Sequence, residues 1–186
     1  MRYGVGIIPA DYAIDPVSLG RAAEDLGFES IFLPEHSHIP VSRRTPFPSG
    51  PVLPDAYRRV IDVFVALGAI AAATKNLKLG TSVCLVIERD PIVTAKQVAS
   101  LDHLSGGRLI FGVGGGWNRE EMEDHGTDPR LRWKILRERC LAMKEIWTRD
   151  EAEFHGEFVD FGPIWSWPKP VLTPPVLIGG EGPTVL

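Results

Sequence analysis

The sequence predicts an α/β protein with a parallel sheet, of the (β/α) barrel type. Short apolar segments alternate with helix-like segments, and this order gives parallel strands joined by right-handed crossovers. Polar residues lie at or just past the carboxyl ends of the predicted strands, where a (β/α) barrel carries its active site. An open doubly wound sheet also binds ligands at strand ends, but usually at one switch point. These polar residues are Glu35, His36, Ser82, Trp117, Asn118 and Glu181.

Five short apolar segments predict the strands, and most of them end at proline or glycine. A (β/α)8 barrel needs eight strands and about 250 residues, so this chain predicts an incomplete barrel with about five of the eight. The open edge and the uncovered apolar surface of such a sheet favour association, including a homo-oligomer. The predicted strands are 3–8, 30–33, 77–83, 108–113 and 175–178.

Capping residues predict the helices between these strands. Asp-Pro pairs at 15–16, 90–91 and 128–129 each offer an N-cap followed by proline in the first turn. The alanine-rich stretch 62–74 adds a buried helix. The proline-rich stretch 39–54 is expected to be a loop. We treat 1–186 as a single partial barrel domain, with a loop-rich insertion at 150–174 before the fifth strand.

Composition limits the classes of partner. The chain has 20 basic and 24 acidic residues, a formal net charge of −4, which argues against a nucleic-acid or anionic-membrane partner. Its longest apolar run, Val63–Ala73, is shorter than the ~20 residues that span a bilayer. Cys84 and Cys140 form no CxxC pair, which is typical of a reducing compartment. We therefore expect a cytoplasmic protein that acts on a small molecule.

The segment Glu35-His36-Ser37-His38 carries the most reactive side chains. An imidazole at the end of a strand can donate a proton to a bound ring or polarise it. The H-x-H spacing also allows a metal pair, but a metal site needs further ligands. The remaining histidines, at 103, 125 and 155, show no ligand spacing, so we predict no metal site.

Two glycine turns follow the fourth and fifth predicted strands. The first, Gly112–Trp117, lacks a dinucleotide fingerprint because the third required glycine falls on Trp117. Its glycines either let a ligand approach the backbone closely or simply form a tight turn. The second, Gly179-Gly180, is suited to binding an anion through backbone N–H groups.

Five stretches taken together match one family in the order that the family has them. They are SIFLPEH at 30–36, LGTSV at 79–83, ASLDHLSGGR at 99–108, FGVGGGWN at 111–118 and PVLIGG at 175–180. The chain resembles the luciferase-like monooxygenase family, in particular its branch that depends on the deazaflavin F420. The segment L-D-x-L-S-G-G-R is the most specific part of this resemblance.

The resemblance implies a (β/α)8 barrel that holds F420 or FMN in its C-terminal mouth. It places His36 beside the reactive face of the ring as proton donor or polariser, with Glu35 orienting it. It also implies a bulge at Ser82 and Val83 behind the ring, joined by a cis peptide bond. The cofactor-binding positions that it implies are Ser82, Val83, Gly116, Asn118, Gly179 and Gly180.

The function that these observations predict is hydride transfer between F420 and an organic substrate. One alternative is an FMN-dependent monooxygenase of the same family. A second is a metal-dependent barrel hydrolase built on His36 and His38, and a third is a non-catalytic barrel fragment. The later strands of the family's barrel normally supply cations for the cofactor phosphate, and we find none of those strands in this sequence.

Overall fold

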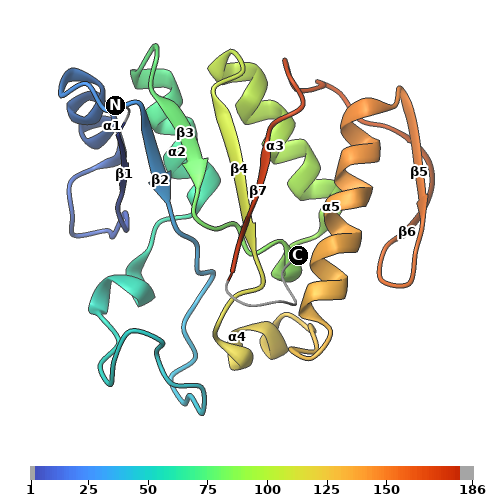
Figure 1. Cartoon of the computed structure of the whole chain (residues 1–186), viewed down its shortest axis with the longest axis horizontal. Coiled ribbons are helices and arrows are strands. Elements are labelled where there is room, and N and C mark those ends of the chain that lie inside the picture. The colour runs from blue at the N-terminus through green and yellow to red at the C-terminus, as the bar shows by residue number, and fades with distance from the viewer. Residues whose placement is uncertain (1–2, 181–186) are drawn as a thin grey trace.

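The computed structural model describes residues 3–180 and contains a five-stranded parallel sheet in the order β1-β2-β3-β4-β7. Its strands follow one another across the sheet in chain order (Figure 1). The predicted strand positions are therefore confirmed, although the first is only three residues long. The strands are β1 (Gly4–Gly6), β2 (Ser30–Leu33), β3 (Lys78–Thr81), β4 (Leu109–Gly114) and β7 (Val176–Gly179).

Four longer helices connect these strands. In Figure 1, α2 and α3 lie behind the sheet, α1 lies at its left edge next to β1, and α5 lies beside β7. Asp15 caps α1 by accepting a hydrogen bond from Ser18 N at 2.9 Å, and Asp90 caps α3 through Val93 N at 2.8 Å. The helices are α1 (Pro16–Asp25), α2 (Val63–Ala73), α3 (Pro91–Ser105) and α5 (Arg132–Thr148), with shorter turns η1 (Asp55–Arg59), η2 (Val86–Glu88) and α4 (Arg119–Asp124).

Two predictions need correction. The helix expected from Asp128 begins at Arg132, because the Asp128 carboxylate accepts from the N–H and the guanidinium of Arg130 instead of capping a helix. The stretch 150–174, expected to be loop-rich, contains an antiparallel hairpin of β5 (Glu151–His155) and β6 (Asp160–Trp165).

The two faces of the sheet are packed differently. Ile31, Leu33 and Leu79 are fully buried in the core cluster that α2 and α3 also enter. On the opposite face the ring of Phe32 lies over Gly80, where an added Cβ would come within 2.2 Å of that ring. Side chains alternate between the faces of a strand, so helices cover one face and few large side chains cover the other.

Arg108 joins three elements near the amino ends of β3 and β4. Its guanidinium donates to the carbonyl oxygens of Ala71 and Leu77 at 2.8 and 2.9 Å, and to Thr74 Oγ1 at 2.9 Å. It also donates to the Ser105 carbonyl oxygen at 2.7 Å. One cation therefore satisfies the carboxyl ends of α2 and α3 and the start of β3.

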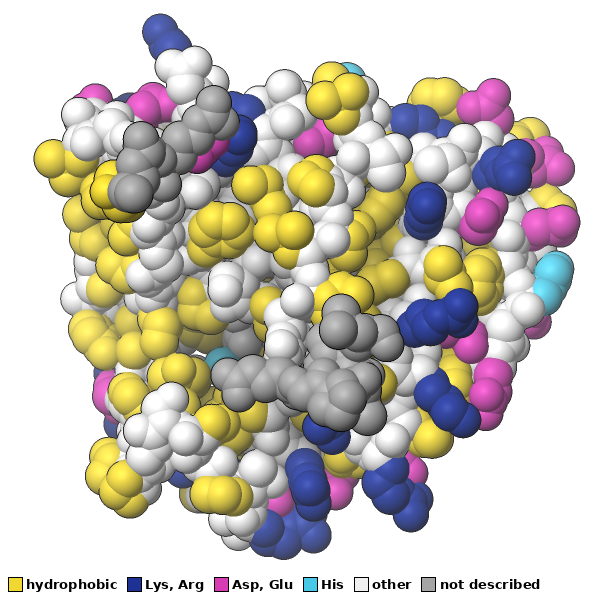
Figure 2. Space-filling view, in the orientation of Figure 1, with side chains coloured by type: hydrophobic (Ala, Val, Ile, Leu, Met, Phe, Trp, Pro, Cys, Tyr) yellow, Lys and Arg dark blue, Asp and Glu magenta, His cyan; other side chains and the backbone are white. Residues whose placement is uncertain are grey.

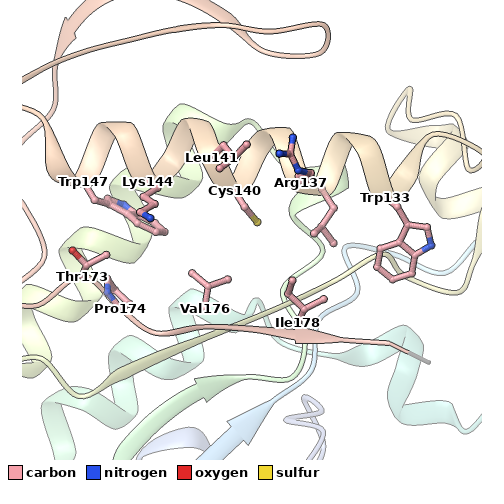
Figure 3. Close-up of a pocket in the computed structure, with 11 residues that line it drawn as sticks. Trp133, Arg137, Cys140, Leu141, Lys144, Trp147, Thr173, Pro174, Val176 and Ile178 are labelled. Carbon is pink, nitrogen blue, oxygen red and sulfur yellow. The ribbon is translucent and has the colours of Figure 1, made fainter. Parts of the chain in front are cut away.

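The free edge of the sheet is β7. Val176 and Ile178 are 41% and 53% exposed and line a groove of about 580 Å³ beside α5. Figure 3 shows Trp133, Cys140 and Trp147 of α5 pointing toward these two side chains. Within residues 3–180, β7 pairs only with β4, so the sheet is not closed into a barrel. None of the helices in this range combines the length and the apolar character needed to cross a membrane.

We predict that Arg108→Met lowers the free energy of unfolding by about 2–4 kcal/mol, because several carbonyl oxygens lose a charged donor. Urea unfolding at neutral pH measures this loss. Arg149→Met is the matched control, since its exposed pair with Glu145 contributes less than about 1 kcal/mol. Equal effects of the two substitutions would contradict the role of Arg108.

Candidate functional site

The carboxyl ends of β2, β3, β4 and β7 meet at one edge of the sheet and enclose a cavity of about 410 Å³, here called the mouth cavity. This edge is the lower one in Figure 1. Tyr57, Leu85, Arg132 and Trp133 complete its lining. Glu181 lies outside the described residues. The cavity brings together seven of the eight predicted site residues, namely Glu35, His36, Ser82, Val83, Gly116, Gly179 and Gly180.

Val83 holds three strand ends together below this cavity. The Ser82–Val83 peptide is cis, as predicted. The Val83 side chain lies between two glycines: a Cβ at Gly114 would come within 2.5 Å of it, and one at Gly179 within 2.7 Å. These two glycines therefore make room for a neighbouring side chain of the protein itself. Gly116 instead has a φ of +64°, a turn conformation that favours glycine.

His36 has both ring nitrogens engaged. Its Nδ1 lies 2.7 Å from Glu121 Oε2, and Trp117 Nε1 donates to its Nε2 at 3.3 Å. An indole N–H only donates, so Nε2 accepts and Nδ1 carries the proton that Glu121 receives as a hydrogen bond. The side chains of His36 and Glu121 are 8% and 1% exposed. The imidazole is therefore fixed in one tautomer and one orientation.

Glu35 does not orient His36, which corrects the role expected for it. Its carboxylate accepts from Leu85 N at 2.7 Å and forms an ion pair with Arg89. Glu35 and His36 therefore reach different neighbours although they are adjacent in the chain. Arg89 also pairs with Asp62 at the start of α2. Glu35 thus fixes the loop after β3 against α2.

Sequence reasoning missed Glu121, the residue that holds His36. It lies on the short helix α4, which was not predicted, and its Oε1 also accepts from Ser37 N at 3.1 Å. The pattern Asn118-x-x-Glu121 is typical of a capping box and could have indicated this helix. The structure uses Asn118 as N-cap residue without a side-chain cap bond, and Glu121 is free to reach His36.

Asn118 is buried beside the mouth cavity without a hydrogen-bond partner. The residue is 1% exposed, and neither Oδ1 nor Nδ2 has a partner among the described residues. Buried amides are nearly always paired, so both polar atoms of Asn118 have an unused capacity to bind a water molecule or a polar ligand group. Asn118 is the predicted site residue that does not line the mouth cavity itself, although it follows Trp117, which does.

Glu88 is a second unpaired group next to the site. Both carboxyl oxygens are buried without a partner in the described structure, and Oε1 lies 3.8 Å from the Cβ position of Gly116. Burial, together with the negative charges of Glu121 and Glu35, raises the pKa of Glu88 to about 9. Glu88 is therefore a neutral acid at neutral pH.

A second polar cluster lies on the outer side of α4. Ser37 Oγ is within 2.8 Å of His38 Nδ1 and 2.6 Å of His125 Nε2, while His38 Nε2 lies 2.9 Å from Asp124. His38 thus points away from the mouth cavity, and His36 and His38 share no site. Across residues 3–180, no set of three or more His, Cys, Asp or Glu side chains is arranged to hold a metal ion.

The comparisons with known proteins agree with this geometry. The family model described as luciferase-like monooxygenase matches residues 9–186. The chain belongs to the luciferase-like monooxygenase family. Its fold is similar to that of the monooxygenase RslO1 from Streptomyces bottropensis, with a TM-score of 0.80 at 23% identity over 96% of this chain and 53% of that one. The predicted family and the incomplete (β/α)8-type barrel are both confirmed.

Related sequences differ in their cofactors. An uncharacterized protein of Mycobacterium tuberculosis is 48% identical over 98% of this chain and 66% of its own length. An F420-dependent glucose-6-phosphate dehydrogenase of Amycolatopsis mediterranei is 35% identical over 63% of this chain and 36% of the relative. An FMNH2-dependent dimethylsulfone monooxygenase of Pseudomonas putida is 36% identical over 57% of this chain and 30% of the relative. The chain thus spans two thirds or less of these relatives.

We predict that Glu88→Gln removes a pH dependence of stability. Between about pH 5 and pH 8 the Glu88 carboxyl group is ionised in the unfolded chain, because its ordinary pKa is 4.5. In the folded protein the same group keeps its proton over this range, because its pKa is about 9. The stability that Glu88 contributes is fully present below the ordinary pKa and is lost as pH rises toward 9. The expected slope is about −1.4 kcal/mol per pH unit.

Urea unfolding at three pH values across this range measures the slope. Glu157→Gln, which changes an exposed carboxylate, is the control and should keep the wild-type slope. If Glu88→Gln also keeps the wild-type slope, the Glu88 carboxyl group is not protonated in the folded protein over this pH range.

Proposed function

We propose that the protein is an F420-dependent oxidoreductase that transfers hydride between the deazaflavin and a small organic substrate. The observation that carries this proposal is the mouth cavity, in which an oriented imidazole faces the strand ends of a luciferase-like fold. The F420-dependent relative supports the choice of cofactor. The activity of the whole protein belongs to this proposal as well, because the chain is shorter than its relatives.

The residues present fit a flat, polar heterocycle. Asn118 offers an unpaired carbonyl oxygen and an unpaired amide N–H₂, which match the alternating donors and acceptors of a flavin-type pyrimidine edge. Val83, fixed between Gly114 and Gly179, would give the ring an apolar support. When bound, the deazaflavin supplies a ring carbon that accepts or releases hydride.

The protein's own contribution is to position a group that transfers a proton. His36 Nε2 is the basic nitrogen of the ring; it accepts a hydrogen bond from Trp117, and both residues line the mouth cavity. We assign to it the transfer of a proton to or from the substrate. Glu121 stabilises the imidazolium that forms when Nε2 takes up a proton, because its carboxylate accepts from Nδ1. Glu121 is thus a positioning residue for His36.

An FMN-dependent monooxygenase is the second candidate, and the FMNH2-dependent relative favours it. Titration of the chain with F420 and with FMN, followed by cofactor fluorescence, distinguishes the two. Saturable binding of F420 with weaker binding of FMN supports the first proposal, and the reverse order supports the second. Binding of neither cofactor would contradict both.

We predict that His36→Asn lowers the rate of hydride transfer by about 10²–10⁴-fold, since a general acid–base group is lost. The Kd for the cofactor should change less than about threefold. Single-turnover absorbance of the cofactor measures the rate. His38→Asn is the matched control, because His38 lies on the outer side of α4. An unchanged rate in His36→Asn would refute its proton-transfer role.

We predict opposite effects of Asn118→Leu on stability and on binding. The free energy of unfolding without cofactor should stay level or rise, because two buried unpaired atoms are removed. Cofactor affinity should fall at least about tenfold, which corresponds to about one lost hydrogen bond. Thermal unfolding and the fluorescence titration measure the two effects. A destabilised variant with full affinity would show that Asn118 is structural.

A further inference from the structure

The polar cluster on the outer side of α4 is here called the outer cluster and consists of Ser37, His38, Asp124 and His125. Ser37 Oγ lies 2.8 Å from His38 Nδ1 and 2.6 Å from His125 Nε2. His38 Nε2 lies 2.9 Å from Asp124 Oδ2. The loop after β2 thus meets the last residue of α4 and the residue that follows it. None of the four residues lines the mouth cavity, so the hydride transfer proposed there does not use them.

The carboxylate of Asp124 fixes the direction of each hydrogen bond in the outer cluster. A carboxylate only accepts, so His38 Nε2 carries the proton and Nδ1 of the neutral ring has a free lone pair. Nδ1 therefore accepts from the Ser37 hydroxyl, whose oxygen in turn accepts from His125 Nε2. Asp124, His38 and Ser37 are thus ordered as carboxylate, imidazole and hydroxyl, which is the order that activates a serine as a nucleophile.

A cavity of about 310 Å³, here called the outer cavity, lies next to the activated hydroxyl. Ser37 and His125 both line it, and Leu85 and Val93 contribute apolar side chains to its wall. Its volume is at the lower end of the range that holds small ligands. The nucleophile and a volume for a small molecule are therefore found at the same place.

The charged groups around the outer cavity already have partners inside the protein. Arg89 forms an ion pair with Glu35, and the Asp90 carboxylate accepts from Val93 N at 2.8 Å. Glu88 keeps its proton at neutral pH, because burial and neighbouring carboxylates raise its pKa to about 9. With these lining charges compensated, the cavity fits a neutral ligand better than an ion.

Water has direct access to the outer cluster. Ser37 and His125 are exposed, and the side chains of His38 and Asp124 are 39% and 59% exposed. Figure 2 shows charged side chains along the lower part of the face it presents, where Figure 1 places α4, so this end of the molecule is well solvated. An ester bound beside Ser37 therefore has water, the second reactant of hydrolysis, at hand.

We propose that Ser37, His38 and Asp124 form a second catalytic site, which hydrolyses small neutral carboxylic esters in the outer cavity. Ser37 Oγ forms a bond to the ester carbonyl carbon while its proton passes to His38 Nδ1. Asp124 stabilises the resulting imidazolium through Nε2–H. His125 Nε2–H, which lies beside the attacking oxygen, is the donor available to the negative oxygen of the tetrahedral intermediate.

The remaining steps return the site to its starting state. His38 gives the proton to the alcohol oxygen as the C–O bond of the ester breaks, which leaves the acyl group on Ser37. A water molecule then attacks the acyl carbon and passes a proton to His38 Nδ1. The carboxylic acid leaves as Ser37 Oγ takes that proton back. Ester and water are thus converted into acid and alcohol, and no cofactor or oxidant takes part.

The test is the hydrolysis of p-nitrophenyl acetate by the chain without added cofactor, followed by the absorbance of p-nitrophenolate. We expect an initial burst of about one product per chain, because an acyl-enzyme accumulates. Ser37→Ala should abolish the burst, and Asp124→Asn should lower the acylation rate at least about tenfold. Ser42→Ala, an exposed serine of the same loop, and Asp25→Asn, an exposed carboxylate of α1, are the matched controls and should keep the wild-type burst.

Peptide mapping by mass spectrometry locates the acetyl group after the burst. Acetylation of Ser37 supports the proposal. Absence of a burst, or a burst that persists in Ser37→Ala, would overturn it, and so would an acetyl group found on His38 or His125, because an imidazole would then attack the ester directly. The proposal does not depend on the cofactor of the mouth cavity, so failure of either proposal leaves the other in place.

Discussion

The contact of Val83 with Gly114 and Gly179 is the constraint on which the site depends. Its side chain fills the space that a Cβ would need at either glycine, so the ends of β3, β4 and β7 can approach one another. Polar residues that directly follow these strands then converge on one cavity. A parallel sheet always places its strand ends at one edge, but close packing decides whether they enclose a volume.

The acidic groups around this cavity have different partners. Glu35 is paired with Arg89, and Glu121 accepts a hydrogen bond from His36. Glu88 lacks a partner within residues 3–180 and stays protonated. Burial and the negative charges of Glu121 and Glu35 favour the protonated form of Glu88, so a third buried anion does not form beside His36.

Much of the site could be predicted from the sequence, because the strand ends are marked locally. The proline after β2 and the glycines after β4 marked the ends of these strands in the sequence. The prediction that His36 and Gly116 lie near strand ends followed from these marks, and both residues line the cavity. The partner of His36 could not be predicted, since Glu121 is 85 residues away in the chain. Nearest-neighbour reasoning selected Glu35, which instead turns toward Arg89.

By itself the sequence determined the order of strands, the helix caps and the glycine positions, since these depend on local backbone preference. It also determined the family, through motifs that keep their order along the chain. Only the tertiary structure decided which carboxylate holds His36 and which acid remains neutral. Those properties depend on burial and on contacts between distant residues, and neither is a property of a local sequence window.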